Sequence, residues 1–201
     1  MAVQTSVEEL QLSPALTAVV QDLGYTQPTP IQIEAIPALL AGRNIIGQSQ
    51  TGSGKTAAFA LPVLQGIEVE RCELQALVIC PTRELTAQVG REIRKLGRDL
   101  NGLQVLELVG GQPSGPQRDS LERGPHIAIG TPGRLLDHLE RGFMKPDSIK
   151  TIVLDEADRM LDMGFEKDIR TIVSQMPDGH QTLLFTATWP KAVQRVAADL
   201  L

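Results

Sequence analysis

The chain has 201 residues, 42% hydrophobic and 21% charged, which fits one globular domain with a full core. Its formal net charge of −5 argues against a surface coated with basic residues for nucleic acid, and its aromatic content of 3% argues against a platform that stacks successive bases. Any nucleic-acid strand must therefore be held locally, through its sugar–phosphate backbone. The sequence has no apolar stretch long enough to cross a bilayer and no signal-peptide pattern, so we expect a cytoplasmic protein with no membrane partner.

Two helices are predicted before residue 43. Ser13 is a suitable N-cap, and Pro14 a suitable first residue, for a helix that stops at Gly24. Thr29 and Pro30 repeat this arrangement for a second helix. The first helix carries its apolar residues on one face, so we expect it to pack against the rest of the domain.

Short apolar runs alternate with helical periodicity from residue 43 onward. Continuous apolar strands between helices are typical of a mostly parallel sheet that is covered on both faces. We therefore predict a doubly wound α/β fold and a single domain over residues 1–201, in which 1–42 precede the core at 43–201. The expected strands contain Ile45-Ile46, Ala76 to Cys80, Val105 to Val109, Ile127 to Ile129, Thr151 to Leu154, and Thr182 to Phe185.

A glycine-containing loop between the first apolar run and a helical segment is the clearest motif. Gly52 and Gly54 let the backbone turn its N–H groups toward an anion, and the helix N-terminus adds its positive dipole end. Lys55 supplies a charge for the outer phosphates and Thr56 a hydroxyl for Mg²⁺. The loop predicts a nucleotide site, although Ser49 stands where the general pattern begins with glycine, and a chance Gly/Ser loop is the alternative. The motif is Ser49-Gln50-Thr51-Gly52-Ser53-Gly54-Lys55-Thr56.

Gln32 lies in the first turn of the second predicted helix, on the approach to the phosphate loop. A glutamine amide offers both a donor and an acceptor, and it therefore matches the edge of adenine in a way that a single charge does not. From spacing alone, a solvated surface glutamine is the alternative.

Every predicted strand is followed directly by a polar or glycine-bearing cluster. In an open parallel sheet, ligands bind beyond the carboxyl ends of the strands, so we expect all six clusters along one edge. The clusters are the phosphate loop, Pro81 to Leu85, Gly110-Gly111, Thr131 to Arg134, Asp155 to Asp158, and Thr186 to Thr188.

Asp155 and Glu156 complete the nucleotide interpretation. An aspartate at the end of a buried strand can hold Mg²⁺ through its water shell opposite Thr56, and the adjacent glutamate can take a proton from an attacking water. The alternative is an acidic pair that only complements a helix dipole, but the presence of the phosphate loop favours catalysis.

A second group of residues is typical of contacts with a phosphate backbone. Hydroxyls, glycine N–H groups and helix N-termini hold such backbones without reading sequence. The alternative is that the threonines are ordinary N-caps and the arginines form internal ion pairs. The residues are Thr82, Arg83, Gly111, Thr131, Gly133 and Arg134.

Together these motifs resemble the DEAD-box ATP-dependent RNA helicases, and most closely their bacterial DbpA branch. The resemblance covers essentially the whole chain and corresponds to the N-terminal one of that family's two RecA-like P-loop NTPase domains. The motifs that carry it are Tyr25 with Gln32, Ser49 to Thr56, Pro81 to Leu85, Gly110-Gly111, Thr131 to Arg134, Asp155-Glu156-Ala157-Asp158, and Thr186-Ala187-Thr188.

The resemblance implies a role for each nucleotide residue. Gln32 would read the adenine edge of ATP or ADP while Tyr25 packs on the ring, and the loop residues Ser49 to Thr56 would hold the phosphates. Thr56 and Asp155 would hold Mg²⁺, partly through water. The catalytic residues would be Lys55, Asp155 and Glu156, the last as general base.

The resemblance also implies an RNA side. Asp158 would bond to Thr186 and Thr188 and so couple the nucleotide site to RNA. Two positions depart from the family pattern, because Val7 stands where a phenylalanine usually supports the adenine pocket and Thr186 where serine is commoner. The residues in contact with the RNA backbone would be Pro81, Thr82, Arg83, Gly111, Thr131, Gly133 and Arg134.

The main hypothesis is therefore an enzyme domain that binds ATP, Mg²⁺ and single-stranded or locally opened RNA. We expect the second RecA-like domain to be absent from these residues, so the isolated domain should be nearly inactive. We also expect it to be a monomer. Resemblance to the DbpA branch implies a role with ribosomal RNA in ribosome assembly. The alternative is a nucleotide-dependent RNA-binding switch without unwinding activity. A small-molecule P-loop kinase is a third interpretation, but no stretch indicates its lid or acceptor pocket.

Overall fold

A six-stranded, wholly parallel sheet is the centre of the computed structural model, which describes residues 6–50 and 52–201. The strand order is β1-β6-β5-β2-β4-β3. The predicted α/β class and the predicted strands are therefore confirmed, and the carboxyl ends of all six strands meet at one edge. The strands are β1 (Ile45–Gln48), β2 (Ala76–Ile79), β3 (Val105–Leu108), β4 (Ile127–Gly130), β5 (Thr151–Leu154) and β6 (Gln181–Thr186).

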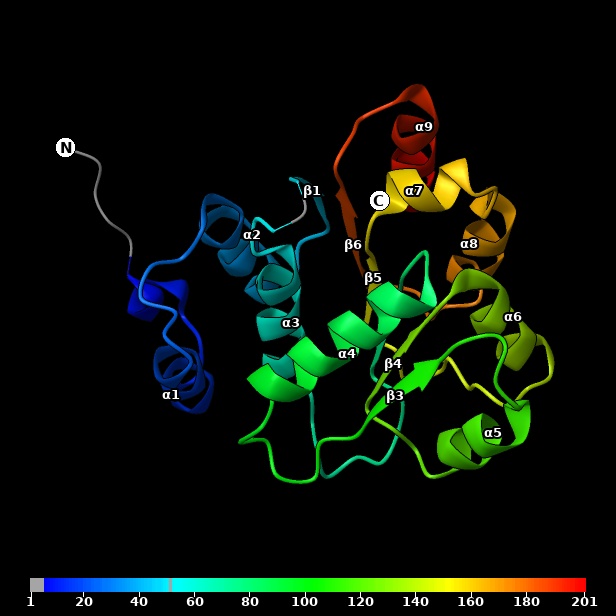
Figure 1. Ribbon diagram of the computed structural model, residues 1–201, viewed down its shortest axis with the longest axis horizontal. Coiled ribbons are helices and arrows are strands. Elements are labelled where there is room, and N and C mark those ends of the chain that lie inside the picture. The colour runs from blue at the N-terminus through cyan, green and yellow to red at the C-terminus, as the bar shows by residue number, and fades with distance from the viewer. Residues whose placement is uncertain (1–5, 51) are drawn as a thin grey trace.

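Helices cover both faces of the sheet (Figure 1). One buried cluster joins a face of the sheet to α1 through α4, and a second joins the other face to α5 through α9. A short 3₁₀ helix, η1 (Val7–Leu10), precedes them. The helices are α1 (Pro14–Asp22), α2 (Pro30–Leu40), α3 (Lys55–Gln65), α4 (Arg83–Leu96), α5 (Ser114–Glu122), α6 (Pro132–Glu140), α7 (Ala157–Asp162), α8 (Glu166–Val173) and α9 (Lys191–Leu200).

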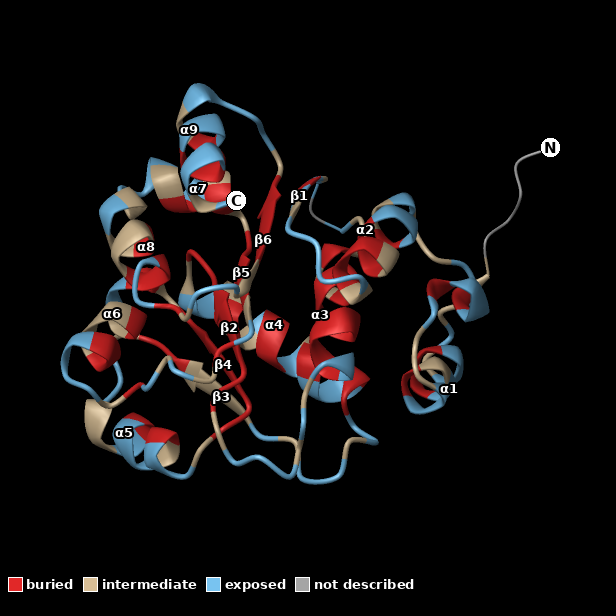
Figure 2. Ribbon diagram, turned by 180° about the vertical axis from the view of Figure 1, so that it is seen from behind, coloured by how far each residue is buried: buried red, intermediate tan, exposed pale blue. Residues whose placement is uncertain are grey.

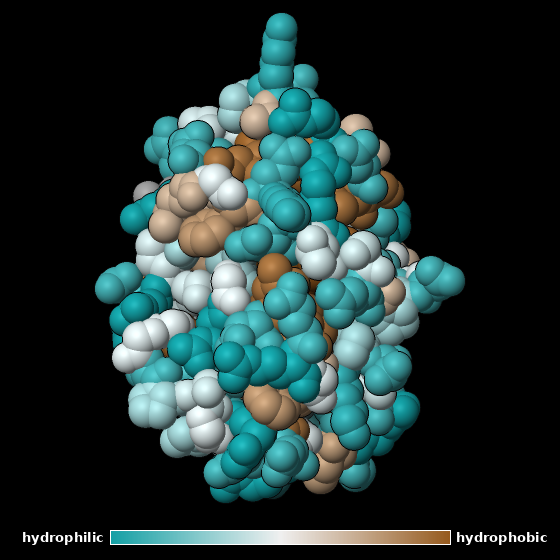
Figure 3. Space-filling model, turned by 90° about the vertical axis from the view of Figure 1, so that its right-hand side faces the viewer, coloured by the Kyte–Doolittle hydropathy of each residue, from teal (hydrophilic) through white to brown (hydrophobic). Residues whose placement is uncertain are grey.

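Burial on both faces explains why the strands are apolar throughout. In β2, Val78 packs in the first cluster while Leu77 and Ile79 pack in the second, and all three are fully buried. The central strands are accordingly buried along their length in Figure 2. The outer side seen in Figure 3 is mostly hydrophilic, because the helices there turn their apolar faces inward.

The N-terminal helices begin as predicted. The hydroxyl of Ser13 accepts a hydrogen bond from the backbone N–H of Leu16, and Pro30 is the first residue of α2. Val7 is 5% exposed and packs in the first cluster, so this position is a core residue. No helix in residues 6–50 or 52–201 is long and apolar enough to cross a membrane.

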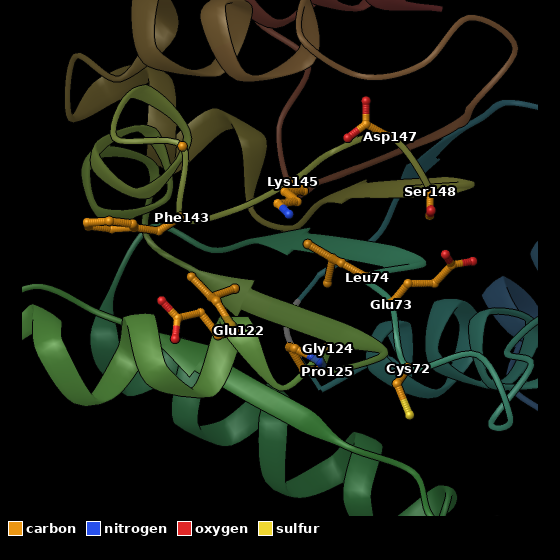
Figure 4. Close-up of a pocket in the computed structure, with 12 residues that line it drawn as sticks. Cys72, Glu73, Leu74, Glu122, Gly124, Pro125, Phe143, Lys145, Asp147 and Ser148 are labelled. Atoms are coloured by element: carbon orange, nitrogen blue, oxygen red, sulfur yellow. The ribbon is translucent and has the colours of Figure 1, made fainter.

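Gly124 permits a close approach of two backbone segments at the amino edge of the sheet (Figure 4). Its φ is +72°, and a Cβ atom here would collide with the carbonyl oxygen of Cys72. Gly142 has a similar φ of +69° but open space around it.

We expect Gly142→Ala to cost about 1–2 kcal/mol of unfolding free energy, the cost of the left-handed conformation alone. Gly124→Ala should cost at least about 3 kcal/mol, because the two segments must also separate. Urea unfolding measures both, and equal losses would contradict this packing.

Candidate active site

A cavity of about 360 Å³ lies at the carboxyl edge of the sheet. Its walls are formed by the phosphate loop, the start of α3, the residues after β5 and one side of α4. Of the other predicted loop residues, Ser49, Gln50 and Ser53 are not among its lining residues, and Thr51 lies outside the described residues. The cavity is lined by Tyr25, Gly52, Gly54, Lys55, Thr56, Ala57, Leu85, Gln88, Glu92, Asp155 and Glu156.

The phosphate loop owes its shape to two glycines and two serines. Gly52 and Gly54 have φ values of +82° and +88°, in the left-handed region that glycine adopts without strain. The hydroxyl of Ser53 donates to the carbonyl of Gln50 at 2.7 Å and lies 2.9 Å from the hydroxyl of Ser49. Ser49, which replaces the first glycine of the general pattern, therefore closes the loop through its side chain.

Lys55 and Asp155 are the least satisfied polar groups of the cavity. They are 6% and 3% exposed, and neither Lys55 Nζ nor Asp155 Oδ1 has a hydrogen-bond partner among the described residues. Burial raises the pKa of Asp155 to about 6, although the charge of Lys55 acts in the opposite direction. Buried polar groups normally find partners, so a cation and an anion at one cavity match a phosphate group with a bound metal ion.

A Mg²⁺ ion here would depend on few protein ligands. In the described part of the chain no group of three or more His, Cys, Asp or Glu residues could hold a metal. Asp155 and Thr56 line one cavity, and Mg²⁺ is commonly held by one carboxylate, water and substrate phosphates. The residues therefore fit a metal that arrives with a nucleotide.

Glu156 has a strained backbone. Its φ and ψ are 54° and 51°, and Gln11 is the only other described non-glycine residue with positive φ. The side chain of Glu156 is 14% exposed, and Oε2 accepts a hydrogen bond of 3.2 Å from Arg159. Such strain costs about 1–3 kcal/mol and is common at functional sites, where it aims a side chain.

Gln32 is buried and binds two parts of the structure. It is 4% exposed, so the alternative of a solvated surface glutamine is wrong. Its Oε1 accepts from the N–H of Thr29 at 2.9 Å, and its Nε2 donates to the carbonyl of Gly54 at 3.1 Å. Each end of the amide keeps one further hydrogen-bonding position, so contact with an adenine edge stays compatible with both bonds.

Helix α4 contributes two residues that the sequence reading missed. Gln88 and Glu92 line the cavity, and Glu92 accepts a hydrogen bond of 2.7 Å from the hydroxyl of Tyr25. Burial and this bond raise the pKa of Tyr25 to about 12. Leu85, Gln88 and Glu92 have the i, i+3, i+7 spacing of one helix face, which is the signal that could have found them.

A wider cavity of about 670 Å³, called the groove below, lies along the same edge. It contains six of the seven residues predicted to contact RNA. The seventh, Gly111, has a φ of +73° and lies directly under Arg83, whose guanidinium a Cβ atom there would meet. The groove is lined by Pro81, Thr82, Arg83, Glu84, Gly110, Thr131, Gly133, Arg134, Asp137, Met163 and Phe165.

The structural alternatives for the groove residues hold only in part. Thr82 is an N-cap, because its hydroxyl accepts from the N–H of Leu85 at 3.2 Å. In residues 6–50 and 52–201, no acidic side chain forms an ion pair with Arg83 or Arg134, so the ion-pair alternative is wrong. Arg134 instead donates to the carbonyl of Gln112 at 3.0 Å. The two arginines therefore line the groove without an ion-pair partner, and two carboxylates, Glu84 and Asp137, line it as well.

The expected coupling residues form hydrogen bonds with one another at the carboxyl edge, where Thr186 ends β6 between β1 and β5. Asp158 Oδ2 accepts from the N–H and the hydroxyl of Thr188 at 2.8 and 2.7 Å. Burial raises the pKa of Asp158, but these bonds outweigh it and leave the pKa below its ordinary value. The hydroxyl of Thr186 donates to the carbonyl of Thr188 at 2.8 Å, and its own carbonyl accepts from the N–H of Ser49 at 3.0 Å.

A third cavity, of about 440 Å³, lies at the opposite, amino edge of the sheet (Figure 4). Its charged residues are Lys145 and three carboxylates, Glu73, Glu122 and Asp147. This lining contains none of the residues predicted to bind phosphate groups, neither those of the phosphate loop nor those of the RNA contacts.

An all-parallel sheet with a phosphate loop after its first strand defines a RecA-like domain of the P-loop NTPase class. The sequence model described as DEAD/DEAH box helicase matches residues 29–196, and the chain belongs to this family.

Two curated relatives and one solved structure agree with this assignment. The chain is 52% identical to the ATP-dependent RNA helicase DbpA of Escherichia coli K12, over 92% of its own length and 41% of that protein. It is 50% identical to the DEAD-box ATP-dependent RNA helicase CshA of Bacillus licheniformis, over 94% and 39%. The crystal structure of a DEAD box protein from Methanococcus jannaschii matches it with a TM-score of 0.94 and 38% identity, over 98% of this chain and 53% of that one. The chain thus spans about two fifths of the length of the curated relatives.

Replacing Asp155 by asparagine should stabilise the domain. Because the folded-state pKa of about 6 lies above the ordinary 3.8, the ionised carboxylate opposes folding at neutral pH. Asp155→Asn should raise the unfolding free energy at pH 7 by up to about 3 kcal/mol, since one pKa unit corresponds to about 1.4 kcal/mol. Protonation of Asp155 should also raise the unfolding free energy of the wild type as the pH falls from 7 to 4. The variant should not show this rise.

Asp158→Asn is the matched control for this effect. The pKa of Asp158 is lowered, so its ionised form supports the fold and the substitution should lower stability at pH 7. Thermal unfolding of both variants at pH 5 and pH 7 measures the difference. A loss of stability in Asp155→Asn would contradict the buried, unpaired state of this carboxylate.

Proposed function

We propose that this chain is the ATP-binding domain of an ATP-dependent RNA helicase. The observation that carries the proposal is the pair of buried, unpartnered groups, Lys55 Nζ and Asp155 Oδ1, in the cavity formed by the phosphate loop. Lys55 would bind a triphosphate here, and Asp155 would hold a metal ion. Glu156 lines the same cavity and would serve as the base for ATP hydrolysis.

The residues of the cavity divide the work of binding and proton transfer. Lys55 and the N–H groups at the start of α3 bind phosphate oxygens, while Asp155 and Thr56 hold Mg²⁺. Mg²⁺, when bound, neutralises charge on the phosphates. Glu156 orients a water molecule and accepts its proton, and its left-handed backbone turns the carboxylate toward the cavity.

Adenine recognition falls to Gln32 and Tyr25. The bonds to Thr29 and Gly54 use one lone pair of Gln32 Oε1 and one hydrogen of Nε2. The second lone pair and the second hydrogen match one donor and one acceptor on the base. Because Gln32 also holds the carbonyl of Gly54, a bound base supports the phosphate loop.

RNA binds in the groove through its backbone, and no base-reading residues are required. Arg83 and Arg134 supply positive charge, Gly111 and Gly133 permit close approach, and the hydroxyls of Thr82 and Thr131 add hydrogen-bonding groups; Pro81 lines the wall. Asp158, through Thr188, links this side to the phosphate loop.

In the whole protein a second RecA-like domain closes on this one and supplies the remaining positive charge for hydrolysis. We therefore propose that residues 1–201 form one domain, monomeric and nearly inactive alone. Local unwinding of ribosomal RNA, in cytoplasmic ribosome assembly, is the activity proposed for the whole protein on its likeness to DbpA. Glu156 argues against a nucleotide switch without hydrolysis, because a switch needs no base in the cavity.

Nucleotide binding tests the proposal directly. A fluorescent ADP analogue should bind the chain in the presence of Mg²⁺ and more weakly after chelation. Lys55→Ala should weaken binding at least about tenfold, the loss of one charge-assisted hydrogen bond. Lys145→Ala, in the amino-edge cavity, is the matched control and should bind as wild type. Equal behaviour of the two variants, or no binding by wild type, would refute the proposed site.

Salt dependence tests the RNA groove. Arg83→Ala and Arg134→Ala should each weaken binding of single-stranded RNA to a similar extent for different sequences. Each should also reduce the slope of log affinity against log salt by about 0.7, the value for one phosphate contact on a single strand. Arg123→Ala, at the C-cap of α5, is the control. A sequence-dependent loss would show that the groove reads bases.

A further inference from the structure

Helix α4 borders both hollows at the carboxyl edge of the sheet. Its first residues, Arg83 and Glu84, line the groove, whereas Leu85, Gln88 and Glu92 line the nucleotide cavity. Glu92 also contacts the side chain of Tyr25, which lines the same cavity.

Glu92 uses both carboxylate oxygens. Oε1 accepts the hydrogen bond of 2.7 Å from the hydroxyl of Tyr25, and Oε2 lies 3.7 Å from the ammonium of Lys95. The same ammonium lies 5.7 Å from the centre of the Tyr25 ring. One carboxylate and one cation therefore fix both the tip and one face of the aromatic ring.

Tyr25 needs such support because its backbone is irregular. The residue lies in the connection between α1 and α2, where its N–H bonds to the carbonyl of Val20. A ring attached to a connection of this kind keeps several rotamers unless its tip is held. A ring that is already oriented loses less entropy when a planar ligand stacks on it.

We propose that Glu92 is a positioning residue for nucleotide binding, which holds the Tyr25 hydroxyl so that the ring forms a fixed wall for a stacked adenine base. The inference rests on the proposed function, since it concerns the same cavity. Lys95 covers one face of the ring, and the base stacks on the other.

A double-mutant cycle tests the contact. Glu92→Ala and Tyr25→Phe should each weaken binding of the fluorescent ADP analogue about threefold to tenfold, since each removes the same hydrogen bond to a charged group. The double variant should lose no more than the larger single loss, because the second substitution removes nothing further. Glu34→Gln, an exposed glutamate on α2, is the control and should bind as wild type.

A spectroscopic titration provides a readout that does not need a nucleotide. Tyr25 is the only tyrosine of the chain, so phenolate absorbance reports on this residue alone. Burial and the bond to Glu92 raise the pKa of Tyr25 to about 12. Glu92→Gln should bring this pKa down toward 10 and leave the thermal unfolding temperature close to that of wild type.

Four results would overturn the inference. Three of them leave the proposed function intact: an unchanged Tyr25 pKa in Glu92→Gln, additive losses in the cycle, and wild-type affinity in Glu92→Ala while Lys55→Ala binds poorly. The fourth is a wild-type chain that binds no nucleotide, which removes the proposed function as well.

Discussion

Parallel pairing of the six strands is the constraint on which the rest of the structure depends. Because every strand runs the same way, each carboxyl end opens on one edge. The order β1-β6-β5-β2-β4-β3 then divides that edge into two halves. The first three strands end at the phosphate loop, the coupling threonines and Asp155, and the last three end at the groove. A nucleotide and a nucleic-acid strand can therefore lie side by side without any rearrangement of the sheet.

Much of this arrangement could be predicted from the sequence, because its signals are local. Apolar runs identify strands buried on both faces, and the polar clusters that follow them must lie together once the strands are parallel. Lys55 and Asp155 are 100 positions apart in the chain, yet Asp155 directly follows β5 and Lys55 ends the loop that follows β1. Motif order alone was therefore enough to place them at one edge.

The remaining features depend on tertiary contacts. The spacing of Glu92 with Leu85 and Gln88 marks one helix face, but its contact with Tyr25 depends on how the connection after α1 packs against α4. The left-handed backbone conformation of Glu156 could not be predicted, because the residue at this position is not a glycine. The internal bonds of Gln32 depend on the packing of α2 beside the phosphate loop, and a sequence pattern shows only that a glutamine is near. In each case the sequence does not show which helix or loop packs against which other part of the fold.

The electrostatics of the cavity and the position of α4 have a common consequence. Lys55 Nζ and Asp155 Oδ1 are buried without hydrogen-bond partners, which makes the cavity costly in its present form. Their opposite charges offset this cost in part, and a ligand that carries an anion and a cation offsets more of it. Any such ligand also meets α4, whose first residue, Arg83, lines the groove together with the N-cap residue Thr82. A helix of 14 residues moves as one body when its contacts change. Occupancy of the cavity can therefore reach the groove through α4, and this route does not require the sheet to deform.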